Sequence, residues 1–189
     1  CWHVASHDFG EEKLLSIFPF LHKIFIKHQL QNNMLTIETT IKNIDTKAMP
    51  ISFGFHPYFK RNAKNATLHL PSEQTLLTDA QQIPNGKTIS KEERWKFEND
   101  EIDLCDTLLD DGFTALERKE ENAIFKLNNI RLLFDKQYSF AQVYAPQYPG
   151  KPYVCIEPMT APTNALNTGG CTLLPAQAEY TAGFSIVLN

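Results

Sequence analysis

Apolar residues recur at every second position through much of the chain, and this alternation constrains the fold more than any other feature. Residues 35–41 place Leu, Ile and β-branched side chains between polar ones, and residues 24–30 follow the same pattern. Gln31-Asn32-Asn33 between the two runs is typical of a turn. We therefore predict a β-hairpin in which each strand has one buried and one solvent-exposed face.

A second hairpin is predicted further along the chain. Residues 124–127 and 130–134 are rich in apolar side chains and flank Asn128-Asn129. Asparagine tolerates the positive φ angles that tight hairpin turns need. Further strands are expected at residues 67–70, 74–78, 140–144, 153–159 and 180–188.

Helical spacing is much weaker than strand spacing in this sequence. Only residues 11–17 and 161–166 hint at an amphipathic helix, and both stretches are short. Parallel sheets need long crossover connections, so many strands without helices between them favour an antiparallel sandwich or barrel. The polar stretch 81–106 is the one candidate for a long loop.

Length and composition favour an ordinary globular protein. The chain has 189 residues, which suits one domain spanning residues 1–189. Hydrophobic residues make up 42% and charged residues 21% of the chain, which excludes a disordered or fibrous protein. The apolar runs are far shorter than the ~20 residues of a membrane-spanning helix, so we expect a soluble protein with no membrane partner.

Charge and cysteine spacing narrow the possible partners. A net charge of −4 argues against nucleic acid, because phosphate binding needs clustered positive charge. The four cysteines lie far apart, without the paired spacing of a zinc site or a disulfide scaffold. We expect reduced thiols, no bound metal and a cytoplasmic location. The cysteines are Cys1, Cys105, Cys155 and Cys171.

Two ionisable residues each stand directly before a proline at the end of an apolar run. They are His56, in FGFHPYFK, and Glu157, in YVCIEPM. Proline favours an extended conformation in the residue before it, so both side chains are expected where a strand meets a loop. A stiff strand end is a suitable place to hold an acid or a base.

The residue types alone leave two interpretations of each side chain. His56 is either a core histidine with one satisfied hydrogen bond or a catalytic acid. Glu157 is either one half of a structural ion pair or a general base. Its apolar neighbours are expected to raise the pKa of Glu157 from its ordinary value toward neutrality.

Three motifs occur in an order that resembles the aldose 1-epimerase (mutarotase) family. They are FGFHPYF at 53–59, LDDGFTAL at 109–116 and CIEPMTAPTNAL at 155–166. The resemblance covers most of the chain and implies an all-β fold, a large antiparallel β-supersandwich. It also implies an isomerase that interconverts the α and β anomers of free hexoses such as galactose or glucose, without metal or organic cofactor.

The resemblance also assigns roles to individual residues. His56 matches the family histidine that donates a proton to the ring oxygen, and Glu157 matches the base that removes a proton from the anomeric hydroxyl. Asp110 matches an aspartate that accepts hydrogen bonds from sugar hydroxyls, and Asp111 is the weaker candidate for that role. The alternative for Asp110 is an aspartate that stabilises a turn.

The sequence departs from the family at its start. Family members carry an arginine and a His-Gly motif upstream of the segment that resembles Cys1-Trp2-His3-Val4, and neither is present here. His3 and His7 do not match that motif and are interpreted as surface residues. We therefore expect a partial sandwich that lacks N-terminal strands, is a monomer or a homodimer, and binds sugar weakly with depressed turnover.

Two other functions stay open at this point. A hexose-6-phosphate mutarotase would need cationic side chains near the pocket, and Lys60 and Arg61 follow His56 closely. A carbohydrate-binding module would keep the sandwich and lose turnover. Aromatic side chains that could stack on a sugar are Trp95, Tyr144 and Tyr148, although core or loop packing is the simpler interpretation of each.

Overall fold

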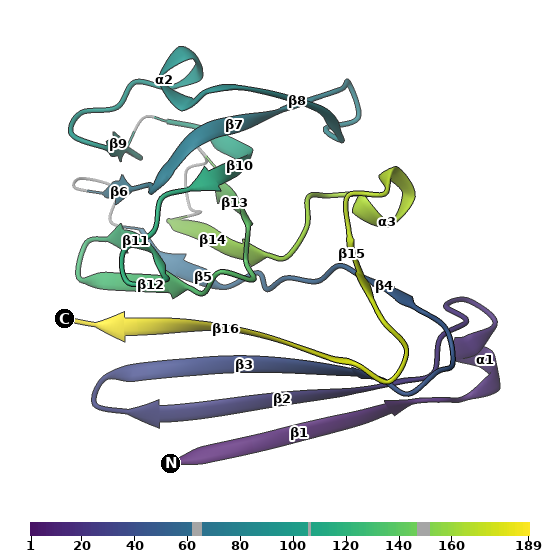
Figure 1. The fold of residues 1–189 in the computed structure, drawn as a ribbon. Coiled ribbons are helices and arrows are strands. Elements are labelled where there is room, and N and C mark those ends of the chain that lie inside the picture. The colour runs from purple at the N-terminus through teal and green to yellow at the C-terminus, as the bar shows by residue number, and fades with distance from the viewer. Residues whose placement is uncertain (62–65, 106, 147–151) are drawn as a thin grey trace.

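The computed structural model describes residues 1–61, 66–105, 107–146 and 152–189. Two antiparallel sheets, of eight and six strands, form the two layers of an all-β sandwich, and a third sheet has two strands (Figure 1). The antiparallel sandwich predicted from the alternation of apolar residues is therefore confirmed. Among the described residues, no helix is both long enough and apolar enough to cross a membrane.

The eight-stranded sheet contains both predicted hairpins. Asn32 and Asn33 adopt positive φ angles in the first turn, and Asn128 does so in the second. In spatial order the strands are β1 (Trp2–Phe9), β2 (His22–Gln31), β3 (Met34–Asn43), β16 (Glu179–Leu188), β12 (Ile130–Phe134), β11 (Ala123–Leu127), β6 (Thr67–His69) and β9 (Glu101–Asp103).

The six-stranded sheet carries the motifs singled out in the sequence. In spatial order its strands are β5 (Tyr58–Lys60), β14 (Tyr153–Met159), β13 (Phe140–Ala145), β10 (Leu109–Leu116), β7 (Ser72–Thr78) and β8 (Pro84–Ser90). The two-stranded sheet pairs β15 (Thr172–Leu174) with β4 (Met49–Ile51). The helices are short: α1 (Glu12–Leu15), α2 (Lys91–Arg94) and α3 (Ala165–Thr168).

The interpretation of residues 81–106 as one long loop is wrong. This stretch contains β8, α2 and β9. β8 has the sequence PNGKTIS, which lacks alternating apolar residues, and it becomes a strand because its backbone pairs with β7 at the edge of the sheet. Strand β1 was not predicted either, since nearly all of its side chains are exposed and show no buried face.

The main hydrophobic core lies between the two large sheets. Its fully buried members include Phe113 and Val143 of the six-stranded sheet and Phe125 and Phe134 of the eight-stranded sheet. The rings of Phe125 and Phe134 lie 4.7 Å apart. Because side chains alternate along a strand, filling this core leaves every second residue of β10, β13 and β14 on the opposite side of the six-stranded sheet. We call that side the open face.

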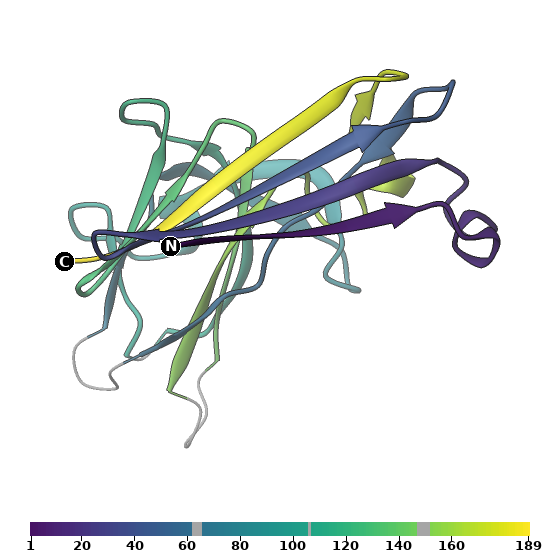
Figure 2. The same ribbon diagram turned by 90° about the horizontal axis from the view of Figure 1, so that it is seen from below.

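A smaller core closes the far end of the molecule. Strands β2, β3 and β16 run well beyond the six-stranded sheet (Figure 2). Near the end of this extension, Ile41 packs with Met49 and Ile51 of β4 and with Leu174 of β15. This second cluster stabilises the extension without contributing to the open face.

Candidate active site

His56 lies directly opposite Glu157 because of one continuous backbone register. Strand β5 pairs with β14 as far as Tyr58, and a bridge between Gly54 and Met159 continues the same antiparallel pairing. Side chains directly opposite each other in such a pair point to the same face. The register therefore brings together two residues that lie about a hundred positions apart in the sequence.

Gly54 allows the close approach that this register requires. A Cβ atom at this position would lie 2.5 Å from the carbonyl oxygen of Pro158. The next residue, Phe55, donates its N–H to that same oxygen at 3.1 Å. Any side chain at Gly54 would therefore push this segment away from β14.

The two side chains meet at the edge of the open face. His56 Nε2 lies 3.1 Å from Glu157 Oε1, with side-chain exposures of 50% and 13% respectively. The imidazole also stacks on the ring of Tyr58, with the ring centroids 4.8 Å apart and the planes 11° from parallel. The histidine is thus held in place yet reachable from solvent, while the carboxylate is mostly enclosed.

Burial changes the protonation of the carboxylate. It raises the pKa of Glu157 from 4.5 to about 7, and the nearby negative charge of Asp110 adds to the effect. The direction is the one expected from the sequence. A carboxylate that titrates near neutral pH is well matched to accepting and returning a proton.

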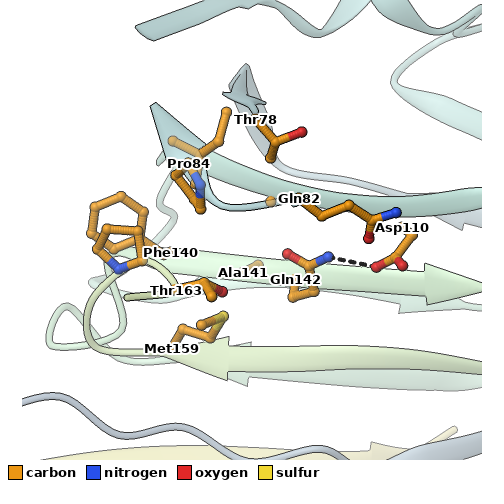
Figure 3. Close-up of a pocket in the computed structure, with 12 residues that line it drawn as sticks. Thr78, Gln82, Pro84, Asp110, Phe140, Ala141, Gln142, Met159 and Thr163 are labelled. Atoms are coloured by element: carbon orange, nitrogen blue, oxygen red, sulfur yellow. Dashed lines mark hydrogen bonds between the residues drawn. The ribbon is translucent and has the colours of Figure 1, made fainter. Parts of the chain in front are cut away.

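Asp110 is placed on the same face by the neighbouring strands. Gln142 of β13 lies opposite Glu157 of β14 on one side and opposite Gly112 of β10 on the other. Its amide Nε2 donates to Asp110 Oδ1 at 2.9 Å (Figure 3). Asp110 belongs to strand β10, so the interpretation of this residue as a turn aspartate is wrong.

Gln142 was missed in the sequence, although a signal for it exists. In β13 the buried residues are Ala141, Val143 and Ala145, which leaves Gln142 on the open face with an aromatic neighbour on either side. The alternation that defined the strand therefore also marked Gln142 as a polar residue aimed away from the core. Gln142 was not predicted as a site residue because it belongs to none of the three family motifs.

A hollow adjoins these polar groups. A Cβ at Gly112 would lie 2.8 Å from Leu76 Cδ1 and 3.2 Å from Gln142 Oε1, so glycine here leaves room for the amide of Gln142. The polar ends of Gln82, Asp110 and Gln142 gather at one end of the hollow in Figure 3, and apolar side chains line the other end. The apolar residues labelled there include Pro84, Phe140 and Met159.

Asp111 serves a different purpose from Asp110. Its side chain is 5% exposed, and its Oδ1 lies 2.7 Å from Nη2 of Arg94, which belongs to α2. Burial raises the pKa of Asp111, and the charge of Arg94 opposes that rise. Asp111 therefore anchors α2 to the sheet.

Lys60 and Arg61, the two cationic side chains that closely follow His56 within the described residues, do not form a cluster at the hollow. Arg61 is 7% exposed, and its guanidinium donates to the carbonyl oxygens of Leu104 at 3.1 Å and Pro146 at 2.7 Å. Arg61 directly follows β5 and is buried, whereas Lys60, the last residue of β5, is exposed. Of this pair, only Lys60 could meet a phosphate group.

The aromatic residues considered for stacking on a sugar, and the two N-terminal histidines, lie in different parts of the fold. Trp95 packs against the main core, whereas Tyr144 lies opposite Asp110 in the β10–β13 register. Tyr148 lies outside the described residues. His3 and His7 are exposed on β1, as the sequence suggested.

Comparison with known proteins defines the class of molecule to which this site belongs. The sequence profile described as aldose 1-epimerase matches residues 2–186. The chain therefore belongs to the aldose 1-epimerase family, as its three motifs suggested. None of the curated proteins matches the sequence.

Solved structures show the same fold. A galactose mutarotase-like protein from Clostridium acetobutylicum superposes with a TM-score of 0.83 at 17% identity, and the match covers all of this chain and 62% of that one. A Synechocystis sp. protein gives 0.75 at 27% identity, covering 100% and 61% of the two chains. Galactose 1-epimerase from Lactobacillus acidophilus gives 0.76 at 14% identity, covering 100% and 62%. The chain thus spans about three fifths of the length of these three structures.

Replacing Gly54 by alanine is expected to disturb the pairing that sets His56 opposite Glu157. The new methyl group would collide with a backbone oxygen, so we expect Gly54→Ala to lower the free energy of unfolding by about 1–3 kcal/mol. Urea denaturation would measure this change. Gly170→Ala is the matched control, since its Cβ would meet its nearest neighbour at 3.7 Å. Equal stabilities for the two variants would contradict the close-approach argument.

The raised pKa of Glu157 predicts a specific dependence of stability on pH. Between its ordinary value of 4.5 and about 7, the folded protein keeps the proton that the unfolded chain has lost. The contribution of Glu157 to the free energy of unfolding must therefore fall as pH rises through this window. Glu157→Gln removes the titration, so its stability relative to the parent should increase over the same range. A difference that stays flat with pH would rule out the raised pKa.

Proposed function

We propose that this chain is an aldose 1-epimerase that interconverts the α and β anomers of free hexoses by acid–base ring opening. The observation that carries the proposal is the 3.1 Å separation between His56 Nε2 and Glu157 Oε1. The anomeric hydroxyl oxygen and the ring oxygen of a hexose are bonded to the same carbon. An acid and a base this close together can reach both oxygens of one sugar.

The proposed reaction moves two protons and breaks one bond. The Glu157 carboxylate takes the proton of the anomeric hydroxyl, and a carbonyl forms at C1 as the C1–O5 bond breaks. The electron pair of that bond goes to O5, which takes a proton from the His56 imidazolium. Rotation about C1–C2 presents the other face of the aldehyde. On reclosure O5 attacks C1 and its hydroxyl proton goes back to His56, while Glu157 gives its proton to the carbonyl oxygen, which becomes the anomeric hydroxyl of either anomer.

The groups beside the acid–base pair are suited to hold a sugar. Asp110 offers carboxylate oxygens, and Gln142 offers both a donor and an acceptor, while the Asp110–Gln142 hydrogen bond fixes their orientation. The ring of Phe140 lines the same hollow and provides an apolar surface for C–H groups. Because Gln142 lies opposite Glu157 in the β13–β14 register, a hexose held by these neighbours would lie beside the acid–base pair.

The arrangement favours an unphosphorylated sugar over a hexose 6-phosphate. Arginine suits a phosphate group because its guanidinium binds two oxygens at once, whereas a lysine such as Lys60 offers only a point charge. Arg61, the arginine nearest to His56 in the sequence, is committed to two backbone carbonyls in the interior. A free hexose needs hydroxyl partners of the kind that Asp110 and Gln142 supply.

Polarimetry of freshly dissolved α-glucose and α-galactose tests the proposed activity. The chain should shorten the relaxation to anomeric equilibrium relative to buffer, and Glu157→Gln should slow it by about 10²–10⁴-fold because the base is lost. His56→Asn should act similarly, with both variants remaining folded by circular dichroism. A chain that binds these sugars without accelerating relaxation would instead be a carbohydrate-binding module.

A separate substitution tests the binding role of Asp110. Asp110→Asn keeps the shape of the side chain and removes its charge, so we expect KM to rise about 10-fold with a smaller change in kcat. Asp8→Asn is the matched control, because Asp8 is exposed on β1 and pairs with Lys23. An unchanged KM in Asp110→Asn would show that sugar hydroxyls do not bind this carboxylate.

A further inference from the structure

Cys155 completes a group of three possible metal ligands that the proposed mechanism does not need. It lies on β14 two residues before Glu157, on the same face, and is 0% exposed. The Cys155 Sγ, a ring nitrogen of His56 and a carboxylate oxygen of Glu157 all lie within 4.8 Å of one another. Cysteine spacing gave no sign of this group, because its members come from two segments that meet only in the fold.

The donor set and its dimensions suit a zinc-like ion. Zinc binds sulfur, imidazole nitrogen and carboxylate oxygen at about 2.0–2.3 Å, usually with tetrahedral geometry. Such geometry places the donor atoms roughly 3.3–3.6 Å apart. The His56–Glu157 separation of 3.1 Å is already close to this. The sulfur and the other two donor atoms lie within 4.8 Å of one another, so a bound ion would have to draw the sulfur inward. Soft sulfur and imidazole ligands also select against Mg²⁺ and Ca²⁺, which prefer oxygen.

The surroundings allow an ion to enter and balance its charge. Half of the His56 side chain is exposed, which leaves a path from solvent and room for water as a fourth ligand. The thiolate and the carboxylate together neutralise a divalent cation. The stacked ring of Tyr58 holds the imidazole in place.

We propose that His56, Cys155 and Glu157 bind Zn²⁺ and that the bound ion blocks the acid–base pair. On binding, the Cys155 thiol releases its proton to solvent as the Zn–S bond forms. His56 and Glu157 then use their reactive atoms as ligands and can no longer exchange protons with a sugar. The inhibitory part of this inference rests on the proposed function, whereas the binding part does not.

Cobalt(II) provides a spectroscopic test of the site that is independent of activity. The experiment uses a background in which Cys1, Cys105 and Cys171 are serine, so that Cys155 is the one remaining thiol. Titration with Co²⁺ should produce a thiolate-to-cobalt charge-transfer band in the near ultraviolet and the visible bands of a tetrahedral ion. Cys155→Ala in this background should abolish the near-ultraviolet band and weaken Zn²⁺ binding, measured by calorimetry, at least 10-fold.

Two controls keep the outcome decisive. Cys155→Ala replaces a buried thiol by a small apolar group, and circular dichroism confirms whether the fold is retained. If the variant does not fold, the His56→Asn variant replaces it and should weaken Zn²⁺ binding by a similar factor. Binding of Zn²⁺ that neither substitution weakens, or a Co²⁺ complex without the thiolate band, would overturn the site.

Polarimetry separates failure of the metal site from failure of the proposed function. Zn²⁺ should slow anomer interconversion by the parent at concentrations at least 10-fold lower than those that slow Cys155→Ala, whereas Mg²⁺ should not slow it. Inhibition that is equal in both proteins would overturn the proposal while the epimerase activity stands. A cobalt complex with the thiolate band, in a chain without epimerase activity, would support the site and contradict the proposed function.

Discussion

The antiparallel register between residues 54–60 and β14 is the constraint on which the site depends. Only this register sets His56 opposite Glu157, and a shift of one position would turn one of the two side chains to the core. Backbone pairing flanks His56 and Glu157 on both sides. Strand β5 pairs with β14 at one end, and the Gly54–Met159 bridge continues the pairing at the other. Backbone hydrogen bonds, more than side-chain contacts, therefore set the distance between the proposed acid and base.

The hydrophobic core determines what the open face can offer. Val154 and Ile156 fill the core between the sheets, so Cys155 and Glu157 must point the other way. The same alternation in β13 exposes Gln142 beside them, and Asp110 follows on β10. The polar site thus lies on the opposite side of the sheet from a packed apolar layer. This packing keeps the polar side chains stiff and limits the access of water to Glu157. The raised pKa of Glu157 follows from that enclosure.

Local patterns in the sequence predicted much of the fold and part of the site. Alternation identified both hairpins, and the following prolines drew out His56 and Glu157, but the expectation that Glu157 lies at a strand end is wrong, because it lies within β14. The polar strand β8 was missed, because it is a strand by pairing with β7 and has no apolar pattern of its own. Gln142 and Cys155 gained their neighbours only when distant strands paired, and register between distant strands cannot be calculated from local residue preferences.

In the proposed reaction, His56 and Glu157 act together on one sugar. The most direct test is the rate of exchange between anomers at equilibrium, measured by NMR for His56→Asn, Glu157→Gln and the double variant. If the two residues act in the same ring-opening step, the double variant should be about as slow as the slower single variant. Losses that multiply in the double variant would show that the two side chains act independently and would contradict this account.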